Sequence, residues 1–73
     1  MNLVIDIGNS RTKIFIFKGD KVIAKADSQS LTVQDLRKIF ARHNIHASIL
    51  SSVAGRNTGV INFLKKNSFK FKS

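Results

Sequence analysis

The chain contains no cysteine, which excludes disulfide bonds and thiolate metal sites. It also lacks tryptophan, tyrosine and glutamate, and no apolar run approaches the roughly 20 residues of a membrane-spanning helix. The N-terminus has no basic region followed by an apolar core and a small-residue cleavage site, so we expect no signal peptide. These absences predict a cytoplasmic protein without a membrane partner.

Acidic residues are scarce as well. Thirteen Lys and Arg residues oppose four acids, which gives a net charge of +9 over 73 residues. Such a balance can favour nucleic acids, nucleotides or anionic membranes as partners. The cations are scattered, however, and no run of five or more like charges occurs. A solvated basic surface therefore explains the charge more simply than a nucleic-acid site, and we do not expect a nucleic-acid partner.

The apolar pattern predicts five strands, at residues 3–7, 11–17, 21–27, 47–53 and 68–72, and a turn at residues 18–20. In the third strand we expect Val22, Ala24 and Ala26 to face inward, with lysines on the outer side as in an edge strand. In the last strand we expect Phe69 and Phe71 to pack into the core, with lysines in water.

Two helices are predicted between these strands. Thr32 and Asp35 have the spacing of a capping box, and an apolar stripe of helical period follows them. Asn44 is a candidate left-handed residue at the end of this helix. A second, weaker helix follows Asn57, which is a candidate N-cap, and is interrupted by Gly59.

The resulting order is βββαβαβ. Right-handed crossovers place both helices on one face if the strands, numbered along the chain, lie in the order 3-2-1-4-5. This order resembles the α/β, mixed-sheet, ribonuclease H-like core that actin-like ATPases share. The first strand is apolar on both faces, yet the helices cover only one. We therefore expect residues 1–73 to be a single N-terminal subdomain that is truncated, with a covering element and the second half absent.

The first strand leads into the most informative segment of the chain. Asp6 ends an apolar strand, where its carboxylate can hold Mg²⁺ directly or through water. Gly8 lets backbone approach a phosphate without a Cβ in the way, and the amides that follow can point at anionic oxygens. Ser10 adds a hydroxyl and Lys13 a cation. The candidate nucleotide-phosphate residues are Asp6, Ile7, Gly8, Asn9, Ser10, Arg11, Thr12 and Lys13.

Structural explanations compete with this interpretation. Asp6 could accept backbone hydrogen bonds at a strand end, and Lys13 could be a solvated rim residue. Gly8 and Asn9 could simply form a turn, although the usual hairpin order is Asn-Gly and here it is reversed. His43 and His46 lie three residues apart with no carboxylate or thiol beside them, so we expect no zinc site.

The segment Asp6-Ile7-Gly8-Asn9-Ser10 resembles the first phosphate motif of the actin-like ATPase superfamily, which includes acetate and sugar kinases. It is most similar to the type III pantothenate kinases, and Ser51-Ser52-Val53 is similar to a strand end in that family. The resemblance implies phosphorylation of pantothenate by ATP in coenzyme A biosynthesis. It also implies Mg²⁺, a monovalent cation (K⁺ or NH₄⁺) bound outside this chain, and a homodimer.

The resemblance further implies that the catalytic aspartate belongs to a Gly-x-Asp-Arg segment, which this sequence does not contain. We therefore expect no catalytic residue in this chain and no activity of the chain alone. Two alternatives stay open. The chain could belong to another actin-like kinase or an accessory paralogue with the same first motif, or it could be a small basic nucleic-acid-binding or interaction module.

Overall fold

The computed structural model of the protein describes residues 1–52 and 57–73, which form five strands and two helices. In chain order the elements are β1 (Asn2–Ile7), β2 (Thr12–Lys18), β3 (Lys21–Ser28), α1 (Val33–Arg42), β4 (Ala47–Ser52), α2 (Thr58–Asn67) and β5 (Lys70–Lys72). The predicted element order is confirmed. Val53 and the predicted loop residues Gly55 and Arg56 lie outside the described residues.

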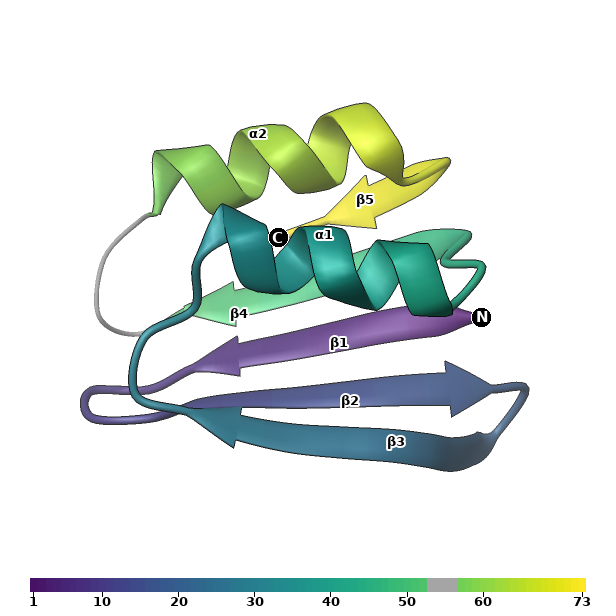
Figure 1. The fold of residues 1–73 in the computed structure, drawn as a ribbon, viewed down its shortest axis with the longest axis horizontal. Coiled ribbons are helices and arrows are strands. Elements are labelled where there is room, and N and C mark those ends of the chain that lie inside the picture. The colour runs from purple at the N-terminus through teal and green to yellow at the C-terminus, as the bar shows by residue number, and fades with distance from the viewer. Residues whose placement is uncertain (53–56) are drawn as a thin grey trace.

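One mixed sheet holds all five described strands in the order β3-β2-β1-β4-β5. β1 pairs antiparallel with β2 and parallel with β4, and β4 pairs parallel with β5 (Figure 1). Both helices lie on the same side of the sheet. The predicted α/β fold class, strand order and helix placement are therefore confirmed.

The core lies between the sheet and the helices. In β1, Leu3 and Ile5 are fully buried, and their cross-strand partners in β2, Ile16 and Ile14, are also buried. These strand residues form one apolar cluster with helix residues. The helix members are Leu36 of α1 and Val60, Ile61 and Leu64 of α2. This cluster fixes β1 at the centre of the sheet and with it the loop that follows.

Both helices are capped at their N-termini by the side chains that the sequence predicted. The Thr32 hydroxyl accepts from the Asp35 amide and the Asp35 carboxylate accepts from the Thr32 amide, so the capping box is present. Asn57 caps α2 by accepting from the Val60 amide. The predicted left-handed Asn44 is wrong, because no described residue other than glycine has a positive φ. Instead α1 ends at His43, whose backbone is extended. The His43 amide still donates to the Ile39 carbonyl.

A bulge changes the predicted faces of β3. Ile16 pairs with Ala24, but the next residue, Phe17, pairs with Val22, so an extra residue is inserted. Cross-strand partners share a face. Val22 therefore lies with Phe17 on the side away from the helices, where it is 48% exposed. The prediction that Val22 faces inward is wrong, because regular alternation breaks at a bulge.

The C-terminal strand is shorter than predicted. Phe71 is half-buried and packs against the core, as expected. Phe69 precedes β5 and is 78% exposed, so the prediction that it packs into the core is wrong. Its ring instead stacks on His46, with centroids 4.9 Å apart. The strand alternation that placed Phe69 inward does not begin until Lys70.

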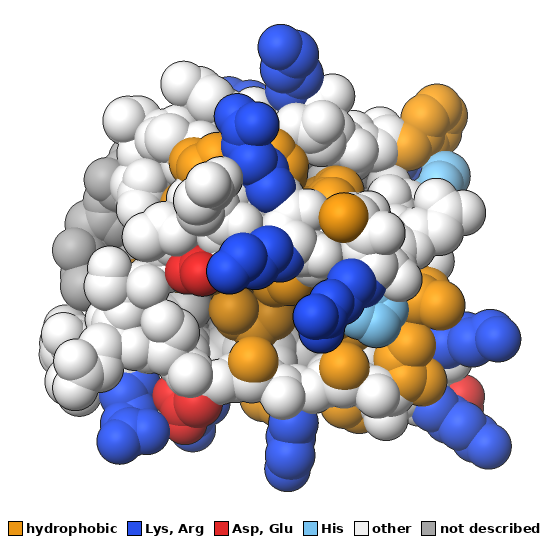
Figure 2. All heavy atoms as spheres, viewed as in Figure 1, with side chains coloured by type: hydrophobic (Ala, Val, Ile, Leu, Met, Phe, Trp, Pro, Cys, Tyr) orange, Lys and Arg blue, Asp and Glu red, His pale blue; other side chains and the backbone are white. Residues whose placement is uncertain are grey.

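The helix side of the molecule has a basic, uneven surface. Lysine and arginine side chains are spread over this side, and apolar atoms show between them (Figure 2). An apolar hollow of about 250 Å³ lies between α1 and β3, with Lys38 and Arg42 among its lining residues. In the described part of the chain, no helix is long and apolar enough to cross a membrane.

Candidate phosphate-binding site

The predicted phosphate segment forms the hairpin turn between β1 and β2. The turn lies at the edge of the sheet where the parallel strands β1 and β4 end (Figure 1). It is closed by a hydrogen bond of 2.8 Å from the Gly8 amide to the Arg11 carbonyl. Ligands of open α/β sheets commonly bind at the carboxyl ends of parallel strands. The turn therefore occupies a suitable position for a ligand site.

The backbone at Gly8 lies in close contact with the far side of the turn. A Cβ built on Gly8 would lie 3.2 Å from the Arg11 carbonyl oxygen, closer than ordinary van der Waals contact. That oxygen is held by the Gly8 amide, so it cannot move away without weakening the closing hydrogen bond. A side chain at this position would therefore widen the turn.

The two residues at the tip of the turn present backbone donors that bond to no other described residue. Asn9 and Ser10 are exposed, and neither amide bonds to another described residue. Successive unpaired amides in a turn can bind an anion, and the Ser10 hydroxyl supplies a further donor. The tip is chemically suited to phosphate oxygens.

A row of polar residues crosses the sheet next to the turn, on the face that the helices leave open. Asp6 of β1 pairs with Lys13 of β2 and with Ser51 of β4, and Lys13 pairs with Asp27 of β3. Directly opposite Cβ atoms in a sheet lie about 5 Å apart. The register therefore brings a carboxylate, an ammonium group and a hydroxyl together beside the amides of the tip.

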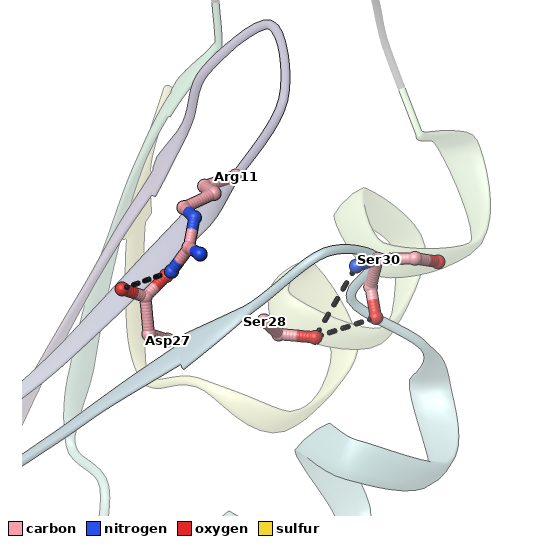
Figure 3. Close-up of polar contacts among 4 residues, drawn as sticks. All are labelled: Arg11, Asp27, Ser28 and Ser30. Carbon is pink, nitrogen blue, oxygen red and sulfur yellow. Dashed lines mark hydrogen bonds and ion pairs between the residues drawn. The ribbon is translucent and has the colours of Figure 1, made fainter.

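The turn is tied to β3 by an ion pair. The Arg11 guanidinium donates to the Asp27 carboxylate over 3.2 Å (Figure 3). Both side chains are exposed, at 65% and 48%, so the pair contributes little to stability. Just beyond Asp27, the Ser28 hydroxyl bonds to the amide and carbonyl of Ser30. Of these contacts, the ion pair joins the end of β3 to the turn between β1 and β2.

The remaining predicted residues lie elsewhere. Thr12 is buried on the helix side, and Ile7, its partner in β1, shares that face. The side chains of these two residues belong to the interior and not to the exposed tip. The sequence did not single out Ser51 or Asp27 as site residues. Their positions follow from strand register, which the order of residues along the chain does not reveal.

The described residues contain no cluster of three or more His, Cys, Asp or Glu side chains that could hold a metal ion alone. Asp6 is exposed and makes no ion pair with any described residue, which leaves its oxygens open to solvent. Mg²⁺ in phosphate sites is commonly held by one or two carboxylates together with waters and phosphate oxygens. The donors at this turn fit a magnesium-bound nucleotide phosphate in that way.

The sheet order and helix placement are those of a half-domain of the actin-like ATPase fold, with the candidate turn between its first two strands. The model of the family described as type III pantothenate kinase matches residues 2–73. The chain therefore belongs to the type III pantothenate kinase family, a family of phosphotransferases. No curated protein and no solved structure gives a significant match to the chain.

Proposed function

We propose that the turn and the polar row beside it form the phosphate-binding part of an ATP site, in a protein that phosphorylates pantothenate. The observation that carries the proposal is the pair of amides of Asn9 and Ser10, which bond to no described residue, at a turn whose first residue, Gly8, lies in close contact with the Arg11 carbonyl. Family membership supplies the reaction, since the matched family consists of pantothenate kinases.

Each residue has a role that its position supports. The Asn9 and Ser10 amides and the Ser10 hydroxyl donate to phosphate oxygens, and Lys13 offsets their charge from the neighbouring strand. Asp6 holds Mg²⁺ directly or through water. ATP, when bound, supplies the phosphoryl group that is transferred. Positioning and charge stabilisation of this kind supply most of the catalysis in phosphoryl transfer.

In this proposal residues 1–73 act as an N-terminal actin-like subdomain in the cytoplasm. The pantothenate site, the K⁺ or NH₄⁺ site and the homodimer interface are formed by residues outside this chain. The catalytic aspartate of the Gly-x-Asp-Arg segment lies outside it too, because the sequence has no such segment. The purified 73-residue chain is therefore inactive, and phosphopantothenate formed from ATP by this chain would refute that statement.

The proposal is tested in a complete enzyme. Residues 2–73 replace the matching segment of a complete type III pantothenate kinase, and the grafted enzyme is assayed with ATP and pantothenate. Asp6→Asn in the graft removes the charge next to the phosphates with little change in shape. We expect kcat to fall at least about a hundredfold, as is typical when an electrostatic contact of the transition state is lost.

Asp20→Asn is the matched control, because Asp20 is an exposed aspartate in the other hairpin turn of the same meander. The control should leave kcat unchanged. Circular dichroism and unfolding curves establish that both variants are folded. A folded Asp6→Asn graft with kcat equal to that of the control would show that Asp6 has no part in the ATP site.

A further inference from the structure

A hollow on the helix side of the sheet has an apolar floor. It measures about 250 Å³ and lies between α1 and β3. Apolar atoms show between lysine and arginine side chains on this side of the molecule (Figure 2). The apolar residues that line the hollow are Ile14, Ile16, Ala24, Ala26 and Ile39. Part of the apolar layer between sheet and helices is therefore accessible from solvent at this point.

Small residues in β3 leave this space. Ile14 pairs with Ala26, and Ile16 pairs with Ala24. Cross-strand partners share a face, so both alanines point toward the helix side, where each contributes only a methyl group. Both isoleucines are 4% exposed, whereas Ala24 is half-buried and Ala26 is exposed. Protein interiors are otherwise closely packed, so a hollow of this size beside the core is suited to a small ligand.

The rim of the hollow on α1 is basic. Lys38 and Arg42 line it, and residues four apart lie on the same face of a helix. Both are exposed and form no hydrogen bond or ion pair with any described residue. His43, at the end of α1, also lines the hollow and adds a ring N–H donor. None of the described lining residues is acidic, so positive charge lies beside the apolar floor.

The floor and the rim together define the chemistry of the ligand. A phosphate group would meet the cations but leave the floor without an apolar contact, and a neutral hydrocarbon would leave the cations without a partner. An anion with a hydrocarbon tail matches both. Because a water-sized group occupies about 30 Å³, the hollow holds about eight such groups. A straight-chain carboxylate of about six to eight carbons has that size.

We infer that the hollow between α1 and β3 binds a medium-chain aliphatic carboxylate, with its tail on the apolar floor and its carboxylate between Lys38 and Arg42. Burial of the tail supplies the affinity, and the two cations select an anion over a cation of the same shape. The inference does not rest on the ATP site. Asp6 and Lys13 of that site belong to the open face of the sheet, which the helices leave uncovered.

The test titrates the full 73-residue chain with sodium octanoate and follows the amide shifts of the protein. Three comparison ligands separate the contributions. Acetate keeps the carboxylate without the tail, octylamine keeps the tail with a positive head, and pantothenate is a carboxylate whose chain contains hydroxyl and amide groups. We expect octanoate to bind at least about tenfold more tightly than each of them. The largest shifts should occur at Ala24, Ala26 and Ile39.

A filling variant tests the floor. Ala24→Leu places a larger apolar side chain in the hollow and should weaken octanoate binding at least about tenfold. Ala41→Leu is the matched control, because Ala41 is exposed on α1 and does not line the hollow. The control should leave the affinity unchanged. Urea unfolding establishes that both variants are folded.

A charge variant tests the rim and does not depend on the filling variant. Lys38→Gln with Arg42→Gln changes two exposed positions, so the fold should be kept. It should reduce the preference for octanoate over octylamine to about threefold or less. Lys65→Gln with Lys66→Gln makes the same change in net charge on α2, away from the hollow, and should keep the preference.

Several outcomes would overturn the inference. These are absence of saturable octanoate binding, equal binding of octanoate and octylamine, or unchanged affinity in a folded Ala24→Leu variant. Pantothenate binding as tight as that of octanoate would show that the floor does not select a hydrocarbon tail. Shifts confined to the open face or spread evenly over the chain would exclude the hollow as the site. Binding to phosphatidylserine vesicles without binding to octanoate would assign the hollow to a membrane surface.

Discussion

On β1, Leu3 and Ile5 face the helices and are fully buried, whereas Val4 is half-buried and Asp6 is exposed on the opposite face. The same strand therefore supplies both the core and the candidate site, through a side-chain period of two. One face gains stability from packing. The other face exposes the carboxylate of Asp6 and part of the apolar side chain of Val4. It can do so because packing on the first face holds the strand in place.

The largest expected difference between the two faces is in packing energy. Ile5→Ala should lower the free energy of unfolding by about 2–5 kcal/mol, because Ile5 is fully buried and its truncation leaves a cavity. Val4→Ala removes less apolar surface from a half-buried position and should cost about 1 kcal/mol or less. Urea unfolding measures both values. Equal losses would mean that the open face is covered in solution.

The two faces should also differ in their tolerance of a lost hydroxyl. The Ser48 and Ser68 hydroxyls bond to each other over 2.7 Å in the interior, whereas Ser51 is exposed on the same strand. Ser48→Ala should cost about 1–3 kcal/mol, because the Ser68 hydroxyl then stays buried without its partner. Ser51→Ala should lie within about 0.5 kcal/mol of the wild type.

A double variant makes this second comparison sharper. Replacing Ser48 and Ser68 together by alanine removes both buried hydroxyls, so part of the loss should be recovered in the unfolding free energy. The double variant could instead lose more free energy of unfolding than the two single variants lose together. In that case the cost comes from lost volume and not from an unpaired hydroxyl.

Much of the covered face could be predicted from the sequence. The apolar runs that predicted β1 and β2, the capping box at Thr32 and the Asn57 cap are local patterns, and the structure confirms them. Right-handed crossovers place both helices on one side when the strands lie in the order 3-2-1-4-5, and the structure has that order. Handedness alone does not select this order; the likeness to the ribonuclease H-like core was needed as well.

The open face was harder to predict. The β3 bulge moves Val22 across the sheet, and the neighbours of Asp6 depend on the register of β4, which is set by loop lengths and packing. The contiguous site residues could be named because the motif is local, and their phosphate contacts stay a prediction. Ser51 and Asp27 were not named as site residues, since they reach the site only through tertiary pairing.

The bulge provides the next test of the comparison. Val22→Thr should change the free energy of unfolding by less than about 1 kcal/mol, because the new hydroxyl stays in water on the open face. Had regular alternation continued, the hydroxyl would face the helices, where burial without a hydrogen bond costs about 1–3 kcal/mol. A loss in that range, measured by urea unfolding, would place Val22 on the covered face.

The smallest expected effect lies at the rim, where Arg11 of the phosphate turn meets Asp27 of β3. Asp27→Asn removes the charge of an exposed pair but keeps a hydrogen-bond acceptor, so unfolding should change by less than about 0.5 kcal/mol. Roughly 1 M salt should abolish even that difference, because the Debye length is then only about 3 Å. The ion pair should instead affect the local order of the turn between β1 and β2, because it restrains that turn at Arg11.

Amide hydrogen exchange at Gly8 measures that order, because the Gly8 amide donates to the Arg11 carbonyl, and Asp27→Asn should speed it up in low salt while leaving exchange in the other turn unchanged. A loss of more than about 1 kcal/mol that persists in high salt would contradict an exposed pair. Uniformly faster exchange in both turns would indicate a general loss of stability. Faster exchange at the phosphate turn alone would show that β3 holds the amides of the candidate site in position.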